Sequence, residues 1–327
     1  MSNSRIFLTI FIICIFSISS ICKGADFNSV SNISLIDARQ LKDDIANWVI
    51  LDARPIKYWE TSHIPGSISF SWENYTTTDE NQIPYRILPP ERMAKAFEKL
   101  GISAESKIVV YGDADKSWGG EGWACWVFAW LGHKGEVRLL KGGIQAWERN
   151  NYPLVDEVKE NLNNNEQINI KDNKNIKTVK YIPNPTASIN ISAKEIFDNP
   201  DKYQLVDTRS TIEWFKGHLP NAVHIPWEDF FKGKDRTPLD SLELRNLLVK
   251  NGVILEKDNQ TKGIIKDKDI RTKGRNIEKK VVYYCTGGIR SGYAWMVHNL
   301  AGYEFKDLPK AINFEGGMAE WEKVVKN

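Results

Sequence analysis

The sequence predicts an α/β fold with parallel β-sheets, present in two copies. Short runs of β-branched and aromatic residues alternate with segments of helical periodicity, which is typical of strands joined by helical crossovers. One ordered set of motifs occurs twice along the chain, which indicates an internal duplication. The length of 327 residues suffices for about two domains, each with a sizeable core.

The elements of the first copy follow in chain order. Helices are expected at 37–47, 90–100 and 122–131, and strands at 48–51, 108–111 and 137–140. Pro90 suits the first turn of its helix, and Gly101 suits a C-terminal cap. The first copy therefore has the strand–helix alternation of a parallel sheet.

Four motifs of the first copy recur in the second. Asp52-Ala53-Arg54, His63-Ile64-Pro65 and Trp72-Glu73 return as Asp207-Thr208-Arg209, His218-Leu219-Pro220 and Trp227-Glu228, each 155 residues later (207 minus 52). Gly142 to Trp147 returns as Gly316 to Trp321, 174 residues later (316 minus 142). A common order at a nearly common offset predicts two copies of one domain.

These observations give a division of the chain into four parts. We expect a signal peptide at 1–24, the first domain at 25–155, a linker at 156–187 and the second domain at 188–327. The linker range is rich in Asn, Lys and Glu and poor in apolar residues, which favours an exposed connection.

The leader predicts export. Arg5 precedes an apolar run from Ile6 to Phe16, and small residues follow up to a cleavage position after Gly24. The apolar run is short for a membrane-spanning helix. We expect a cleaved leader and a periplasmic protein, with lipidation at Cys22 or a retained anchor as the alternatives.

Charge and cysteine content exclude several classes of protein. The formal net charge is +2, which gives no global case for binding nucleic acid or an anionic membrane. Of the four cysteines, Cys14 and Cys22 lie in the leader, so that Cys125 and Cys285 remain after cleavage. Their spacing fits neither a metal site nor a disulfide framework, and no cofactor is expected.

The stretch from Val281 to Gly292 carries the chemistry. A strand-like run ends at Cys285, and two glycines and Arg290 follow before a helix-like run from Tyr293 to Leu300. Glycines let successive backbone N–H groups turn inward, and a helix N-terminus adds partial positive charge. We expect a thiol held at this position to react as a thiolate.

The sequence Cys285-Thr286-Gly287-Gly288-Ile289-Arg290 resembles the active loop of the rhodanese (sulfurtransferase) family, and the repeated motifs extend this resemblance over nearly the whole mature chain. The resemblance implies two tandem rhodanese-like domains, each a five-stranded parallel sheet with helices on both faces. It also implies that Cys285 carries a persulfide. The persulfide-binding residues would then be Thr286, Gly287, Gly288, Ile289, Arg290 and Ser291.

The duplication indicates which half is active. Aligning the strand at 109–111 with that at 281–283 places Asp113 opposite Cys285 and makes the first loop two residues longer. A carboxylate cannot carry a sulfane sulfur, and Cys125 falls inside an apolar helix. We therefore expect an inactive first domain that walls the cleft of the second, with Trp118 and Asp115 within reach of that cleft.

Asp207 and Arg209 are expected to be structural residues near the site. Their counterparts, Asp52 and Arg54, stand in the half that has no loop thiol. A carboxylate and a guanidinium at a strand end form a strong pair that holds neighbouring loops.

The chemistry expected of the loop is a two-step transfer. The Cys285 thiolate takes sulfane sulfur from thiosulfate, mercaptopyruvate or polysulfide, and an acceptor such as cyanide, a thiol or sulfite removes it. Small sulfur-containing anions are therefore the expected partners, with a periplasmic protein partner as a further one. Family members acting on the first two donors tend to carry an arginine where this chain has Glu213, which weakens the case for both.

Two alternatives stay open at this stage. A cysteine phosphatase or arsenate reductase on the same fold would have five residues between its cysteine and arginine, whereas four separate Cys285 from Arg290. The second alternative is a periplasmic protein that binds or carries sulfane sulfur with little turnover. No feature of the sequence argues against it.

The segment 256–280 has no counterpart in the first half. It holds nine Lys or Arg against five Asp or Glu. Such a segment is either a solvated loop or a basic flap that attracts anionic donors.

Overall fold

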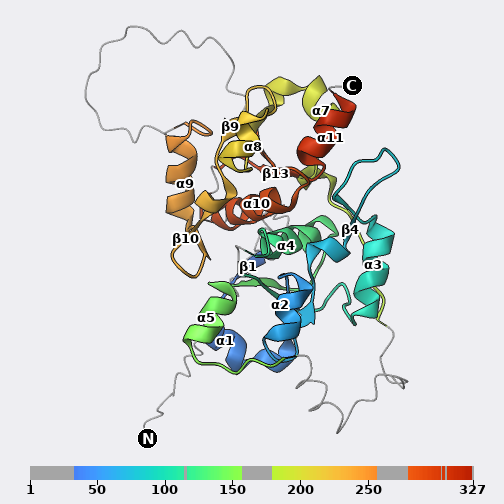
Figure 1. Ribbon diagram of the computed structural model, residues 1–327, viewed down its shortest axis with the longest axis vertical. Coiled ribbons are helices and arrows are strands. Elements are labelled where there is room, and N and C mark those ends of the chain that lie inside the picture. Colours follow the sequence, from blue (N-terminus) through green and yellow to red (C-terminus); the bar gives the residue numbers. More distant parts are fainter. Residues whose placement is uncertain are drawn as a thin grey trace, which may run out of the picture.

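The computed structural model describes residues 33–113, 116–156, 179–255, 279–302, 304–305 and 308–325. Within these ranges the chain forms two α/β halves that lie one above the other (Figure 1). The predicted signal peptide, most of the predicted linker and residues 256–278 of the basic insert lie outside the described residues.

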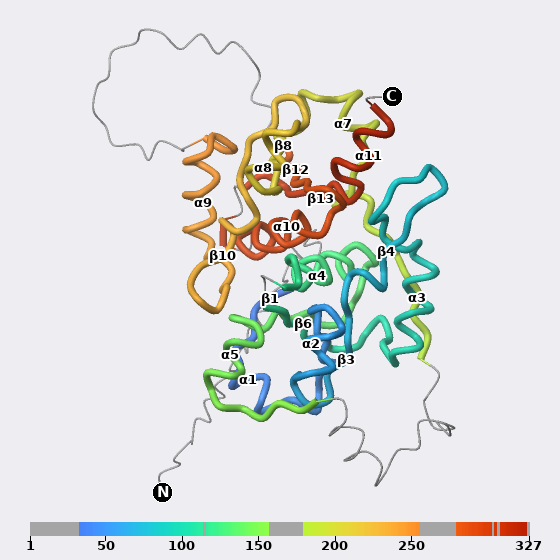
Figure 2. Tube along the Cα trace, viewed as in Figure 1, coloured from blue at the N-terminus to red at the C-terminus, as the bar shows by residue number. Residues whose placement is uncertain are grey.

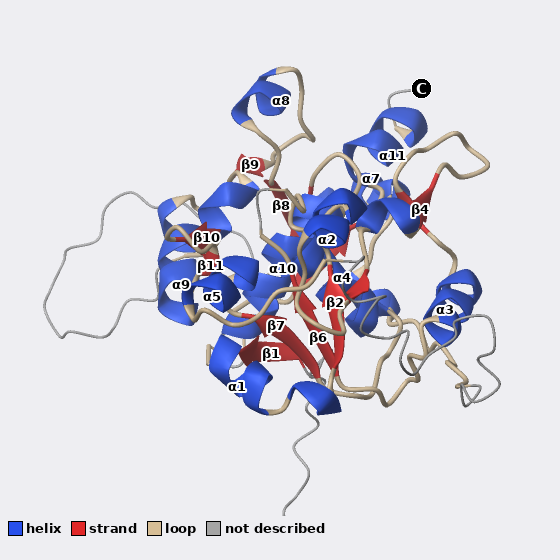
Figure 3. Ribbon diagram, turned by 60° about the horizontal axis from the view of Figure 1, so that its bottom comes forward, coloured by secondary structure: helices blue, strands red, loops and turns tan. Residues whose placement is uncertain are grey.

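The first sheet has five parallel strands in the order β1-β7-β6-β2-β3, and Figure 3 labels β1, β7, β6 and β2 of this sheet. The strands are β1 (Ile33–Ile36), β2 (Val49–Asp52), β3 (Ile68–Ser69), β6 (Ile108–Tyr111) and β7 (Val137–Leu140), and β4 (Thr76–Thr77) and β5 (Arg86–Ile87) form a separate hairpin. The helices are α1 (Ala38–Asp43), α2 (Ile56–Thr61), α3 (Pro90–Lys99), α4 (Gly120–Trp130) and α5 (Gly143–Arg149), with 3-10 turns η1 (Ile45–Asn47) and η2 (Trp72–Asn74).

The second sheet has four described parallel strands in the order β13-β12-β8-β9. They are β8 (Tyr203–Asp207), β9 (Val223–His224), β12 (Lys280–Tyr284) and β13 (Ala311–Phe314), and β10 (Phe231–Lys232) and β11 (Thr237–Pro238) form a second hairpin. The helices are α7 (Ala193–Asp198), α8 (Thr211–Phe215), α9 (Ser241–Lys250), α10 (Ile289–Ala301) and α11 (Gly317–Val324), with 3-10 turns η3 (Ala187–Ile189), η4 (Pro200–Lys202) and η5 (Trp227–Phe230).

The fifth position of the second sheet holds a single parallel bridge, between Asn190 and Asn313. In the first sheet the corresponding edge is the full strand β1. In both halves a capping residue then starts a helix, Asp37 for α1 and Ser192 for α7. The tandem α/β architecture expected from the sequence is thus confirmed, with one edge strand reduced to a bridge.

Helices cover both faces of each sheet, and α4 and α10 lie at the centre (Figure 2). A hydrophobic core shared by the two halves lies between the sheets, and a smaller core lies on the outer face of each sheet. Nearly every residue of α4 and α10 is buried, because each is covered by its own sheet on one side and by the other helix on the other. The apolar character of residues 122–131 is explained by this position.

Both central helices begin earlier than the sequence predicts. Gly119 and Gly288 precede them with left-handed φ values of 76° and 85°, and this turn lets the chain enter the helix directly from the loop. Helix α10 therefore starts at Ile289, and Arg290 and Ser291 occupy its first turn.

The last residues of the predicted linker pack on the first domain. Tyr181 is buried in an edge-to-face contact with Phe97, and the Asn184 N–H donates to the Leu131 carbonyl. Across the ranges that the structure describes, every helix is too short or too polar to cross a bilayer.

Candidate functional site

Cys285 directly follows β12 and is 2% exposed. Its carbonyl accepts the Met318 N–H at 2.8 Å, and the Thr286 carbonyl accepts the Ala319 N–H at 3.0 Å. The loop is thereby fixed from behind by the first turn of α11. The thiol side of the loop lies at the carboxyl end of the central strand, where parallel sheets place their sites.

The backbone N–H groups of residues 286–291 donate no hydrogen bond to any described residue, and Gly292 is the first whose N–H is used, by the Gly288 carbonyl. Six successive donors without acceptors at a loop and helix start form a concave site for an anion. The sulfur of Cys285 begins this run, so the donors surround the position that an added sulfur atom would take.

Two glycines of the loop are required by close contacts. A Cβ on Gly288 would lie 2.5 Å from the Glu315 carbonyl oxygen, and one on Gly287 would collide with Tyr85 of the first domain. Gly288 also has the left-handed backbone noted above, which favours glycine. Ile289, the next residue, is buried in the shared core.

Ser291 lies beside the sulfur. Its Oγ is 3.7 Å from Cys285 Sγ and donates to Asn313 Oδ1 at 2.7 Å, while Asn313 Nδ2 donates to the Gly288 carbonyl at 3.1 Å. Asn313 thus fixes both the serine and the left-handed turn of the loop. Sequence reasoning did not single out Asn313, although an asparagine between Ile312 and Phe314 in a buried strand is a usable signal.

Arg290 does not present a free charge. It forms a two-pronged pair with Glu213 of α8, with Nη1 to Oε2 at 2.7 Å and Nη2 to Oε1 at 2.8 Å. Thr286 joins the pair, donating to Glu213 and accepting from Arg290, each at 3.0 Å. The hydrogen bonds from Arg290 hold the pKa of the Glu213 carboxyl well below its usual range. The arginine closes the loop, and its positive charge is paired with Glu213 and also interacts with Cys285.

The first domain supplies side chains to this loop. The Arg290 guanidinium lies over the Trp118 ring at 5.7 Å from its centroid, as expected for a residue that reaches the cleft, whereas Asp115 lies outside the described residues. Tyr85, the residue directly before β5, rests against Gly287. Sequence reasoning missed Tyr85, which carries no local motif.

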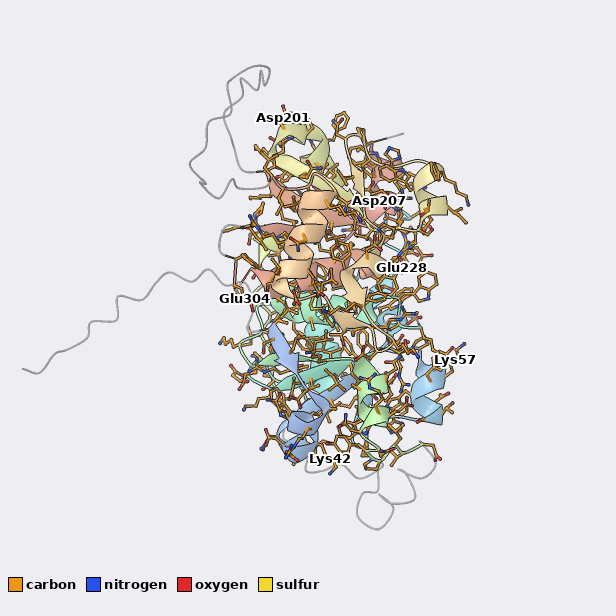
Figure 4. All side chains as sticks on the ribbon, turned by 90° about the vertical axis from the view of Figure 1, so that its left-hand side faces the viewer. Lys42, Lys57, Asp201, Asp207, Glu228 and Glu304 are labelled. Carbon is orange, nitrogen blue, oxygen red and sulfur yellow. The ribbon has the colours of Figure 1, made fainter. Side chains whose placement is uncertain are left out.

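Asp207 and Arg209 lie behind the loop and are buried in the second domain, where Figure 4 labels Asp207. Arg209 Nη2 donates to Asp207 Oδ2 at 2.6 Å and to the Gly217 carbonyl at 2.7 Å. Asp52 and Arg54 form the same pair at 2.6 Å in the first domain. Neither Asp207 nor Arg209 has a recorded contact with the sulfur.

The first-domain loop differs from the sequence alignment by one residue. Tyr111 pairs with Asp52 across the sheet, and Tyr284 pairs with Asp207, so the residue after each tyrosine is the true counterpart. Gly112, not Asp113, therefore stands in the place of Cys285, and the first loop is longer by three residues rather than two.

Asp113 fills the first loop with its own carboxylate. Its Oδ1 accepts the N–H groups of Lys116 and Ser117 at 2.7 and 3.3 Å, which occupies donors that the second loop leaves open. Cys125 is fully buried in α4, and burial raises the pKa of its thiol. Among the described residues, no group of three His, Cys, Asp or Glu could hold a metal ion.

The two hairpins are placed reciprocally. Tyr85 (φ 64°) reaches the second-domain loop, and the β10–β11 hairpin, with Arg236 at φ 52°, lies beside the first-domain loop. There Asp235 pairs with Arg149 of the first domain at 2.7 Å. Each domain thus borders the loop of the other.

Comparison with known proteins agrees with this geometry. The family model described as "Rhodanese-like domain" matches twice, at residues 37–150 and 192–324. The chain is 29% identical to "Sulfur carrier protein TtuD" of Thermus thermophilus over 83% of this chain and 86% of that protein. It is 28% identical to a "Putative thiosulfate sulfurtransferase" of Haloferax volcanii over 89% of this chain and 91% of that one.

Solved structures share the fold. The 3-mercaptopyruvate sulfurtransferase SseA of Escherichia coli aligns with a TM-score of 0.63 at 17% identity, covering 86% of this chain and 98% of that one. Wild-type EanB aligns with a TM-score of 0.65 at 20% identity, covering 90% of this chain and 68% of that one. The two matched domains and the open loop of the second show that the chain belongs to the rhodanese family, as a tandem-domain sulfurtransferase.

Proposed function

We propose that the protein is an exported sulfurtransferase that carries sulfane sulfur on Cys285 as a persulfide. The observation that supports this most directly is the run of unused N–H donors from residue 286 to residue 291, which starts at the cysteine. A persulfide anion on Cys285 would accept hydrogen bonds from these donors without any rearrangement of the loop.

Transfer takes two steps with one covalent intermediate. The Cys285 thiolate attacks the outer sulfur of a donor, the donor's bond to that sulfur breaks, and the electron pair leaves with the remnant. An acceptor such as cyanide, sulfite or a thiolate then attacks the outer sulfur of Cys285–S–S⁻, and the sulfur–sulfur bond breaks to restore the thiolate. The loop amides stabilise both anionic states of the cysteine, while Ser291, bonded to Asn313, holds the loop beside the sulfur.

Intact-mass measurement of the mature protein tests this mechanism. Brief exposure to thiosulfate, mercaptopyruvate or polysulfide is expected to add one sulfur atom, which cyanide then removes. Cys285→Ser should gain nothing, whereas Cys125→Ala should gain as the wild type does, because Cys125 is sealed in α4. Absence of any gain from every donor would refute the persulfide mechanism.

The second candidate function is sulfur carriage with little turnover. It is favoured by the name of the Thermus relative and by the neutralised Arg290, which leaves the rim of the loop with little attraction for small anions. Rapid loading from polysulfide combined with slow release to cyanide would support carriage. Many turnovers per second with cyanide would support the enzyme.

Export rests on residues 1–24. The mass of the chain recovered from the periplasmic fraction is the test. A mass that starts at Ala25 supports cleavage, one that starts at a lipidated Cys22 supports the lipoprotein alternative, and recovery of full-length protein from the cytoplasm would overturn export.

A further inference from the structure

The mouth of the Cys285 loop lacks a free cation among the described residues that contact it. Arg290 lies within this loop, and Arg86 of the first-domain hairpin lies beside Gly316, which follows β13. Glu213 binds both terminal nitrogens of Arg290. Arg86 lies 2.9 Å from Glu315 and also pairs with Glu320. A doubly charged donor such as thiosulfate would approach a thiolate here with only the charge of Arg290, which Glu213 already pairs, to offset the repulsion.

The first-domain side chains exposed beside the Cys285 loop are aromatic rather than positively charged. Trp118 is 54% exposed beside Arg290, and Tyr85 is 42% exposed against Gly287. Trp72 meets Tyr85 edge-on at 6.1 Å between ring centroids. All three rings belong to the first domain, and Trp118 and Tyr85 lie against the loop of the second, so these two rings border the loop of Cys285.

One polar atom in this aromatic group has no partner. The indole N–H of Trp72 is buried and donates to no described residue. The nitrogen is closed off from solvent, so a molecule bound at the exposed rings does not reach it. The exposed rings of Trp118 and Tyr85 suit an apolar organic group or a polarisable sulfur.

We propose that the preferred donor is an organic persulfide, R–S–SH, whose R group lies against Trp118 and Tyr85, and that Glu213 sets this preference. The inference rests on the proposed function of Cys285. In the loading step the Cys285 thiolate bonds to the outer sulfur, the S–S bond of the donor breaks, and R–S⁻ leaves with the bonding pair. The proton of the donor's S–H stays on the new Cys285–S–SH or passes to solvent, and no oxidant or reductant is needed.

Glu213→Gln and Trp118→Asn separate charge from aromatic contact. Glutamine keeps the size of Glu213 and removes its charge, and asparagine suits the left-handed backbone of Trp118, whose φ is 54°. Phe197→Asn serves as the matched control, since this aromatic residue is 59% exposed on α7, away from the contacts of the loop. The measurement is the second-order rate constant for loading one sulfur atom on Cys285, by intact mass, from benzyl persulfide and from thiosulfate.

The wild type is expected to load faster from benzyl persulfide than from thiosulfate. Glu213→Gln should raise the thiosulfate-to-benzyl persulfide ratio of rate constants about tenfold, the effect of one unpaired charge near the surface. Trp118→Asn should raise the same ratio about tenfold by slowing benzyl persulfide, through the concentration at half-saturation rather than the limiting rate. Phe197→Asn should leave the ratio at its wild-type value.

The outcomes distinguish this inference from the proposed function. Loading from both donors with thiosulfate preferred, or ratios that neither variant changes, would overturn the organic-persulfide assignment while persulfide chemistry at Cys285 stood. Failure of both donors to load the wild type would remove the proposed function and this inference together.

Discussion

Gly122 of α4 and Gly292 of α10 face one another where the two central helices cross. A Cβ on Gly122 would lie 2.5 Å from Tyr293 Cα, and one on Gly292 would lie 3.0 Å from Trp123 Cα. The duplicated glycine thus lets the two backbones approach closely, and the helix pair joins the domains about an approximate two-fold relation.

Gly122→Ala should therefore destabilise the protein. The added methyl group meets backbone, which cannot move aside as a flexible side chain does, so we expect a loss of about 1–3 kcal/mol. Gly302→Ala is the control, because its nearest neighbours lie at 3.5 Å and its φ is −62°. Urea unfolding of both variants measures the difference, and equal stabilities would contradict the close crossing.

The paired Asp–Arg motifs predict equal structural roles. Asp52→Asn and Asp207→Asn each leave a buried guanidinium without its counter-charge, and each should cost about 3–5 kcal/mol. Thermal unfolding of the two variants is the measurement. A variant of Asp207 that kept full stability but lost sulfur loading would instead assign this residue to the chemistry.

The position of Gly112 predicts that a thiol cannot simply be restored to the first domain. A Cβ there would lie 2.5 Å from Glu121 Oε2 and 2.9 Å from Ser117 Oγ, and Asp113 occupies part of the neighbouring amide set. In a Cys285→Ser background, Gly112→Cys should gain no sulfur from any donor. Thermal unfolding confirms that the double variant is folded, and a gain of one sulfur atom would show that the first loop is competent.

Glu315 predicts a pH-dependent stability. It is 1% exposed, accepts the Ile87 N–H at 2.6 Å, and has Oε2 2.9 Å from Arg86 without hydrogen-bond geometry. Burial raises its pKa to about 7, against the opposing effects of Arg86 and the Ile87 N–H and with a further rise from Glu320.

The sign follows from this raised pKa. The folded protein keeps a proton that the unfolded chain releases above its ordinary pKa of 4.5. The stabilisation is complete below that value and is lost as the pH rises through about 7, up to about 3 kcal/mol. Glu315→Gln should be nearly free of this loss, so the difference in unfolding free energy between variant and wild type should grow from pH 4.5 to pH 7.5. A constant difference would contradict the raised pKa.

Sequence analysis predicted the features that occur in both halves and missed the contacts that join the two halves. The strand–helix alternation, the duplicated motifs and the loop thiol were all visible as local patterns. The register error at Asp113 arose because Tyr283 and Tyr284 are adjacent, and either can be aligned with Tyr111. Only the pairing of Tyr284 with Asp207 in the sheet shows that Tyr284, and not Tyr283, is the counterpart of Tyr111.

Contacts between distant segments explain the other differences. Glu213 was noted as a missing arginine, but its pairing with Arg290 depends on how α8 is placed over the loop, 77 residues away in sequence. Tyr85 reaches Gly287 from the other domain, and no local pattern encodes such a contact. The early start of α10 depended on the left-handed turn at Gly288, which Asn313 and Glu315 hold from β13 and the residue after it.

Because each hairpin borders the loop of the other domain, substitutions in the two halves have different consequences. Substitutions at Asp113 in the first loop affect only folding, because that loop holds no thiol, whereas substitutions at Trp118 and Tyr85 in the same domain reach the reacting loop of its neighbour. A gene that encoded only the second half would supply the cysteine without its aromatic wall. The copy without a thiol is therefore retained beside the active one, and natural variation at Tyr85 should be restricted by the chemistry of a loop that belongs to the other domain.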